Sequence, residues 1–379
     1  MSSYSERVLT EGMNSRLPGT LLLATALAAG GCTSAVGEFL FPEAEAAGIN
    51  GALLRTAYLE ADHIPNMKSL LVWRHGQIVA EHYYHGTEVD DTHDVRSVTK
   101  TVLSMLVGIA AERGFIGGVD DTLGEHLGPV AGKLDTAVES TTLRHLLTMT
   151  AGHEWRELGG PSEFRLWVSS PNQVRYIVEK SLVDPPGTRF CYSDGSAHLV
   201  SVALSEATGM STKEFAQQAL FEPLGINRRP WLTDRQGYNY GGVGLQLTPR
   251  EMVKLGALYL RHGSYEGKQV VPAHWVEVST RALVSTDEAL PLGSSYGYFW
   301  WVGRSGGRDL HFANGYGGQF IINVPDLDLV VVATSRWRNL RGTAELQWSV
   351  ILDLVLRGVI PAVKPQAGGE PTTPGRPES

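Results

Sequence analysis

The chain has 379 residues, of which 42% are apolar and 19% are charged, and its formal net charge at neutral pH is −8. This length and composition indicate a globular protein with one large domain or two closely joined ones. A mildly acidic chain without a block of lysine and arginine argues against nucleic acid as the main partner.

The N-terminal stretch RLPGTLLLATALAAGGC has the pattern of a bacterial secretory signal. Arg16 precedes an apolar run that is too short to span a membrane, and small residues then lead to Cys32. We expect residues 1–31 to be removed and Cys32 to carry lipid. The protein would then be exported, either periplasmic or anchored to a membrane by its lipid. Ala29 stands where lipoprotein signals have Leu, so an ordinary signal cut nearby is the alternative, and Met13 is a second candidate start.

The cysteine and histidine content bears on metal binding. Cys191 is the one cysteine beyond the signal, which excludes an internal disulfide and a metal–thiolate site in the mature chain. The twelve histidines are scattered, and no HExxH motif occurs. We therefore expect neither a metal nor a cofactor.

The expected elements follow in chain order. Residues 69–84 predict two strands around a His-Gly turn, and an apolar helix follows from about residue 97. Helices with Ser or Thr caps and Gly ends are expected at 141–152, 196–209 and 248–263. Strands return at 295–302, 318–325 and 327–335, and a last helix covers 344–357. The tail, 361–379, is rich in Pro and Gly and is expected to be disordered.

Strands at both ends and helices in the middle predict an α+β fold. An antiparallel sheet flanked by helices would be built from residues 45–115 and 240–360 of one catalytic domain, 45–360. A mainly helical domain, 116–239, would be inserted into it.

Ser97 and Lys100 stand at the head of the apolar helix. Residues three apart lie on one helix face, so both side chains would point into the same space. A serine hydroxyl is a weak nucleophile until a base takes its proton. Burial and the positive end of a helix favour the neutral form of a lysine, which can then act as that base. The alternative is a solvated lysine in the first turn.

Two later segments could complete such a site. Tyr192 lies on a turn before a helix and could relay a proton near a cation, or could be a half-packed turn residue. The glycine-rich residues 310–325 predict an edge strand that another backbone approaches closely. Such a strand can donate a backbone N–H to an oxyanion, and a plain hairpin is the alternative.

In this order, the three elements resemble the motifs of the serine β-lactamase and penicillin-binding superfamily. The sequence around these motifs is similar to class C β-lactamase-related serine hydrolases, in the branch of 6-aminohexanoate-dimer hydrolases and related esterases. The segments that carry the resemblance are RSVTKTVLSMLVGIA, LRHLLTMTAGHEW, PPGTRFCYSDGSAHLV, GGVGLQLTPREMVKLG and GYGGQFIINVPDLDLVVV. They span about residues 65–358 and imply a β-lactamase/transpeptidase-like α/β sandwich.

The resemblance assigns roles to the residues. Ser97 would be the acylated nucleophile, Lys100 its base partner, and Tyr192 the relay of the proton to the leaving group. Backbone N–H groups of Ser97 and of residues 313–315 would hold the oxyanion. The substrate would be a small ester, amide or peptide-like molecule, and the protein a β-lactamase-related esterase or amidase.

Two departures from the family pattern affect these expectations. Asp194 stands where the family has Asn, and its carboxylate would stabilise the ammonium form of Lys100 and weaken it as a base. The third motif, Lys-Thr-Gly or His-x-Gly, is absent as such. His311 comes nearest to its place, followed by Asn314 and Gly315. Without a lysine to bind a carboxylate there, penicillin-like anions are the less expected substrates.

Three aromatic residues are candidates for the pocket wall or, equally, ordinary core or surface residues: Trp155, Trp167 and Tyr316. Two other functions stay open on the sequence alone. One is a β-lactamase or cell-wall DD-peptidase of the same fold. The other is a binding or sensor protein that keeps the fold without turnover.

Overall fold

The structure is a computed structural model that describes residues 39–157, 163–286, 295–338, 340 and 343–364. The predicted signal with Cys32, and the tail beyond residue 364, lie outside the described residues. None of the helices in the described part of the chain is long and apolar enough to cross a bilayer.

An antiparallel sheet of eight strands forms one half of the molecule, as the sequence predicts, in the order β2-β1-β12-β11-β10-β9-β8-β7. Strand β1 (Met67–Arg74) lies between β2 (Gln77–Tyr83), its partner across the turn at residues 75–76, and β12 (Leu329–Ser335). Thus the sheet joins the two ends of the folded chain. The remaining strands are β11 (Gln319–Val324), β10 (Arg308–Gly315), β9 (Trp301–Ser305), β8 (Ser295–Tyr296) and β7 (Val284–Ser285).

Helices cover both faces of the sheet. Trp348 of α14 (Ala344–Asp353) donates to Asn314, whereas Asn323 next to His311 donates to the Gly256 carbonyl of α12 (Pro249–Leu260). Asn314 and His311 are three apart on β10 and so point to opposite faces. With both faces covered, β11 and β12 are buried along their whole length, which explains their continuous apolar runs.

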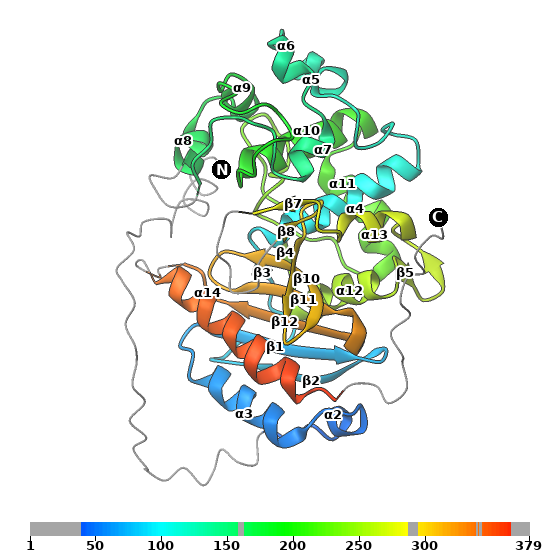
Figure 1. Cartoon of the computed structure of the whole chain (residues 1–379), viewed down its shortest axis with the longest axis vertical. Coiled ribbons are helices and arrows are strands. Elements are labelled where there is room, and N and C mark those ends of the chain that lie inside the picture. Colours follow the sequence, from blue (N-terminus) through cyan, green and yellow to red (C-terminus); the bar gives the residue numbers. More distant parts are fainter. Residues whose placement is uncertain (1–38, 158–162, 287–294, 339, 341–342, 365–379) are drawn as a thin grey trace, which may run out of the picture.

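Figure 1 shows the helical part of the chain on one side of this sheet. It holds α5 (Leu123–Ala131), α6 (Thr136–Glu139), α7 (Leu143–Leu147), α8 (Glu163–Ser169), α9 (Gln173–Val178), α10 (Asp194–Thr208), α11 (Thr212–Ala216), η2 (Gln217–Phe221) and η3 (Glu222–Leu224). Other elements are α2 (Pro42–Ala46), α3 (Gly51–Asp62), β3 (His93–Asp94), β4 (Gln246–Leu247), β5 (Ser264–Tyr265), β6 (Lys268–Gln269), α13 (Ala273–Ser279), η4 (Pro325–Leu327), η5 (Leu354–Val359) and η6 (Ile360–Ala362). The division into a sheet part and a helical insertion stays a prediction.

Two helices are buried on all sides and bring the two halves together. In α4 (Val98–Glu112) every residue from 98 to 110 is buried, and α10 is buried from 194 to 205. A helix that is apolar all round belongs in a protein interior. Helix α4 packs against β10, β11 and α10, so its first turn lies between the sheet and the helical region.

Three expected elements differ from the structure. The helix predicted at 141–152 is only α7, capped by Thr142, and the chain leaves the helix at Met149, which takes a left-handed conformation with φ 59°. Helix α10 begins at Asp194, two residues early, because Ser193 caps it. The run 295–302 forms parts of two strands, β8 and β9.

A buried arginine ties the N- and C-terminal segments to the sheet. Arg74, 2% exposed, donates from Nε to Leu327 O at 3.0 Å, from Nη1 to Ala47 O at 2.7 Å and from Nη2 to Lys364 O at 3.0 Å. One guanidinium thus satisfies three carbonyls from segments that are far apart in the chain. Nearby, Asn50 N donates to Ala362 O at 2.8 Å.

Replacing Arg74 by Met leaves these carbonyls without their donor. We expect the free energy of unfolding, measured by urea denaturation, to fall by about 3 kcal/mol. Arg357→Met is the matched control, because the Arg357 side chain is 83% exposed and forms an ion pair with Asp353, four residues earlier. Its effect should stay within about 0.5 kcal/mol. Equal effects of the two substitutions would contradict a structural role for Arg74.

Candidate active site

The local backbone presents Ser97 at the start of α4. Arg96 takes a left-handed conformation, φ 51°, and its N–H donates to Asp94 Oδ1 at 3.0 Å. Ser97 is the N-cap residue, yet its side chain makes no capping hydrogen bond to the described helix. The hydroxyl therefore remains for another partner.

Lys100 is that partner, and it is buried. Its side chain is 1% exposed, and Nζ donates to Ser97 Oγ at 3.0 Å. Nζ also donates to the Gly242 carbonyl at 3.2 Å and forms an ion pair with Asp194 Oδ1. A buried ammonium needs such partners, and here all three of its donors are used.

Asp194, the first residue of α10, shares the interior with a second carboxyl group. Glu157 Oε2 accepts the N–H of Asp194 at 2.7 Å and Trp155 Nε1–H at 2.8 Å, so the two carboxyl groups lie next to each other. Burial, and then the Asp194 charge, raise the pKa of Glu157 well above its ordinary value. Burial would also raise the pKa of Asp194, but the charge of Lys100 and the hydrogen bonds from Glu157 and Lys100 outweigh it and lower that pKa.

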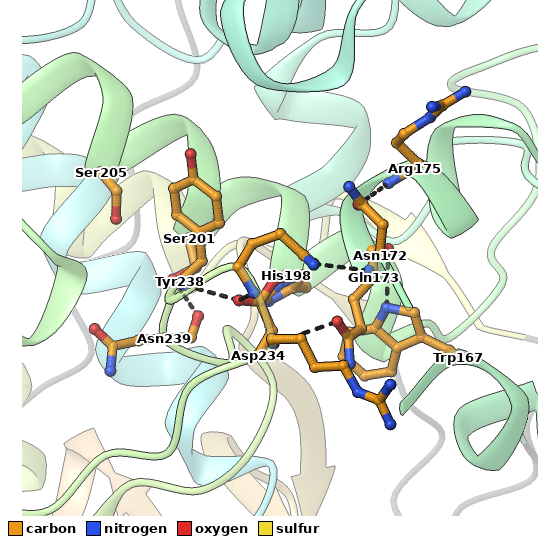
Figure 2. Close-up of polar contacts among 12 residues, drawn as sticks. Trp167, Asn172, Gln173, Arg175, His198, Ser201, Ser205, Asp234, Tyr238 and Asn239 are labelled. Atoms are coloured by element: carbon orange, nitrogen blue, oxygen red, sulfur yellow. Dashed lines mark hydrogen bonds and ion pairs between the residues drawn. The ribbon is translucent and has the colours of Figure 1, made fainter. Parts of the chain in front are cut away.

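The carbonyl that receives Lys100 lies in a tightly packed loop. A Cβ on Gly242 would lie 2.1 Å from Asp194 Oδ1 and 2.9 Å from Lys100 Nζ, so only glycine fits there. Figure 2 shows the side chains that hold the preceding loop on α10. His198 bonds Asp234 at 2.9 Å, both with fully buried side chains, and Ser201 Oγ donates to the Asn239 carbonyl at 2.7 Å. The buried polar cluster of Figure 2 therefore supports the position of the Gly242 carbonyl.

Tyr192 lies beside Lys100. The Lys100 Nζ is 4.8 Å from the centre of the Tyr192 ring, and this ring stacks on Trp301 of β9 with 6.0 Å between centroids. The structure thus brings together the three residues predicted from the two motifs: Ser97, Lys100 and Tyr192.

Of the third motif, only its end comes close to the segment that carries Ser97. A Cβ on Gly315, the last residue of β10, would lie 2.4 Å from the Val95 carbonyl oxygen, so the strand passes directly against the segment before Ser97. Asn314 points the other way and accepts Trp348 Nε1–H at 2.5 Å.

His311 does not belong to the site, which corrects the prediction from the sequence. It is four residues from Gly315 along an extended strand, roughly 13 Å away. Its Nε2 accepts from Asn323 Nδ2 at 2.9 Å in the layer between β10 and α12, and burial lowers its pKa to about 3. A neutral, buried histidine cannot bind a substrate carboxylate.

The three aromatic candidates for the pocket wall differ in exposure. Trp167 is fully buried against His198 and Tyr240, and it is a core residue. Trp155 is 5% exposed, and its indole N–H donates to Glu157. Tyr316 is half-buried in the turn after β10 and remains a candidate.

Sequence reasoning missed Glu157, Gly242 and Arg96. The GGVG run and the Trp-x-Glu spacing were visible, but each acquires meaning only through its contact with the start of α10. Arg96 is 3% exposed and lies with its guanidinium carbon 4.3 Å from the Trp337 ring centre. Within the described ranges, no group of three or more His, Cys, Asp and Glu could hold a metal ion.

Comparisons with known proteins find relatives of this chain in sequence and in fold. The 6-aminohexanoate-dimer hydrolase of Paenarthrobacter ureafaciens is 26% identical over 312 residues, 76% of this chain and 77% of that protein. The octameric penicillin-binding protein homologue from Pyrococcus abyssi has a TM-score of 0.63 at 19% identity, covering 81% of this chain and 77% of the other. EstCE1, a hydrolase with promiscuous acyltransferase activity, has a TM-score of 0.64 at 18% identity, covering 82% and 98%.

At such identities the two solved structures establish the fold alone, and the family follows from the sequence. The profile of the Beta-lactamase family matches residues 55–356. This range includes the whole sheet and the residues around Ser97. The resemblance inferred from the motifs is thereby confirmed: the chain belongs to the β-lactamase family.

Proposed function

We propose that the protein is a serine hydrolase that cleaves ester or amide bonds through an acyl-enzyme on Ser97. Lys100 and Tyr192 are its proton-transfer partners. The observation that carries the proposal is the hydrogen bond from a buried Lys100 to Ser97 Oγ. The relative named as a 6-aminohexanoate-dimer hydrolase and the acyl-transferring EstCE1 support a hydrolase that works by acyl transfer.

The steps use groups already described. Ser97 Oγ bonds to the carbonyl carbon while its proton passes to the neutral form of Lys100, and the carbonyl π electrons move onto oxygen. The backbone N–H of Ser97, at the positive end of α4, and one near Gly315 hold this oxyanion. Tyr192 then relays the Lys100 proton to the leaving group as the bond between that group and the carbonyl carbon breaks. Water attacks the acyl carbon, its proton returns along the same path to Ser97 Oγ as the acyl–oxygen bond breaks, and the acid is released.

The nucleophile is tested by Ser97→Ala. Loss of the attacking oxygen should lower kcat for a p-nitrophenyl ester by about 10³-fold or more while circular dichroism stays unchanged. A fluorophosphonate should add its mass to the wild-type chain at Ser97 and not to the variant. Full activity in a folded variant would refute the acyl-enzyme and would leave a binding or sensor role.

The Lys100 contacts are tested by Gly242→Ala. The added methyl group must displace Asp194 or Lys100, and a shift of about 1 Å at reacting groups can cost about a hundredfold in kcat/KM. Gly128→Ala is the matched control, because a Cβ there meets nothing within 4 Å on an exposed helix position. The control should keep wild-type kcat/KM. A Gly242→Ala enzyme as active as wild type would show that this loop does not fix the position of Lys100.

Substrate choice is tested with a neutral short-chain ester and a cephalosporin reporter. His311 is buried, so the third motif offers no cation to a carboxylate, and loss of a charged hydrogen bond costs about 1.5–3 kcal/mol, or on the order of ten- to a hundredfold in affinity. We expect kcat/KM to be higher for the ester. A cephalosporin value equal to or above it would favour a β-lactamase with its anion site elsewhere, Arg304 or Arg308 being the candidates.

A further inference from the structure

Three charged or ionisable side chains lie in a row behind Ser97, and the proposed mechanism uses only the first. Lys100 of α4 contacts Asp194 of α10, and Asp194 contacts Glu157 of the segment that follows α7. All three are shielded from water: Lys100 is 1%, Asp194 2% and Glu157 9% exposed. Two carboxyl groups therefore face one ammonium in the protein interior.

The hydrogen bonds define which form of Glu157 fits. Its Oε2 already accepts two N–H groups, from Asp194 and Trp155. Two carboxyl groups held next to each other in the interior repel strongly when both are ionised, so one of them keeps its proton and can donate to the other. Asp194 already accepts from the Lys100 ammonium, so the proton belongs to Glu157.

From this arrangement we propose that Glu157 is a positioning residue that acts in its neutral form. It donates to Asp194 and holds that carboxylate against Lys100. The inference deepens the proposed function, on which it rests for its effect on catalysis. With Glu157 neutral, the row Lys100–Asp194–Glu157 has no net charge, whereas an ionised Glu157 would add a buried negative charge and stabilise the ammonium form of Lys100.

The charged groups around Glu157 support this direction. Burial and the Asp194 carboxylate favour its neutral form, and the Lys100 ammonium and the Asp194 N–H oppose it but are outweighed, so the pKa of Glu157 is raised. Arg96, near the start of α4, acts on Asp194 and favours the Asp194 carboxylate.

Glu157→Gln is the test, because an amide reproduces the neutral acid: its oxygen accepts both N–H groups and its NH₂ donates to Asp194. We expect this variant to keep wild-type kcat/KM within about threefold in mildly acidic solution. The ratio of its kcat/KM to that of wild type should then rise with pH, since only wild type gains the second negative charge. Glu157→Ala, which loses every bond, should lower kcat at least tenfold at all pH values.

Thermal unfolding of the same proteins gives a readout that does not depend on catalysis. A carboxyl with a raised pKa in the folded state binds more protons folded than unfolded, so its contribution to stability falls as pH rises above its unfolded value of about 4.3. The Tm of Glu157→Gln relative to wild type should therefore increase between about pH 5 and pH 9. Glu154→Gln, exposed three residues earlier on the same segment, should show neither trend.

The outcomes separate the two proposals. A constant Tm difference and a constant kcat/KM ratio across this pH range would overturn the neutral Glu157. A rising Tm difference together with an active Ser97→Ala enzyme would keep the neutral Glu157 and remove the proposed function instead. A rising Tm difference with wild-type kcat in a folded Glu157→Ala enzyme would show that Glu157 is neutral but has no part in positioning Lys100.

Discussion

The burial of one ammonium group is the constraint on which this structure depends. Lys100 can lie at the inner end of an apolar helix only because Ser97, Asp194 and the Gly242 carbonyl each accept one of its N–H donors. Those partners come from α4, from α10 and from the loop before β4. The same three bonds therefore stabilise the contact between the sheet and the helical region and place the Ser97 hydroxyl at their junction.

Local sequence signals predicted the elements that carry these groups. The cap at Thr248, the glycine after α10 and the turn after β1 are recognisable because each acts within a few residues. The length of helix α7 was overestimated because Met149 takes a left-handed conformation, φ 59°, which the apolar periodicity of the sequence does not show. Strands at both ends of the chain predicted the sheet, but its strand order was not predicted, since pairing between distant segments leaves no local trace.

The site was predictable to the extent that it follows helix geometry. Ser97 and Lys100 are one turn apart, so their meeting follows from the spacing alone. Glu157 reaches Asp194 only through folding, and no pattern links these two positions in sequence. His311 was predicted to belong to the site because it was located by counting residues back from Pro325. Such a count does not tell which residue of the strand lies beside Ser97.

The position of β1 between β2 and β12 in the sheet has a consequence for the order in which the chain assembles. One edge of β1 pairs with β2 as soon as the hairpin forms, whereas its other edge must wait for β12, almost at the end of synthesis. Pairing over such a separation is slow compared with the formation of local helices. Until residues 329–335 emerge, β1 presents a row of unpaired backbone groups that another chain could occupy. A chain cut short before β12 would thus lose little of its length and yet keep unpaired edges on both β1 and β11.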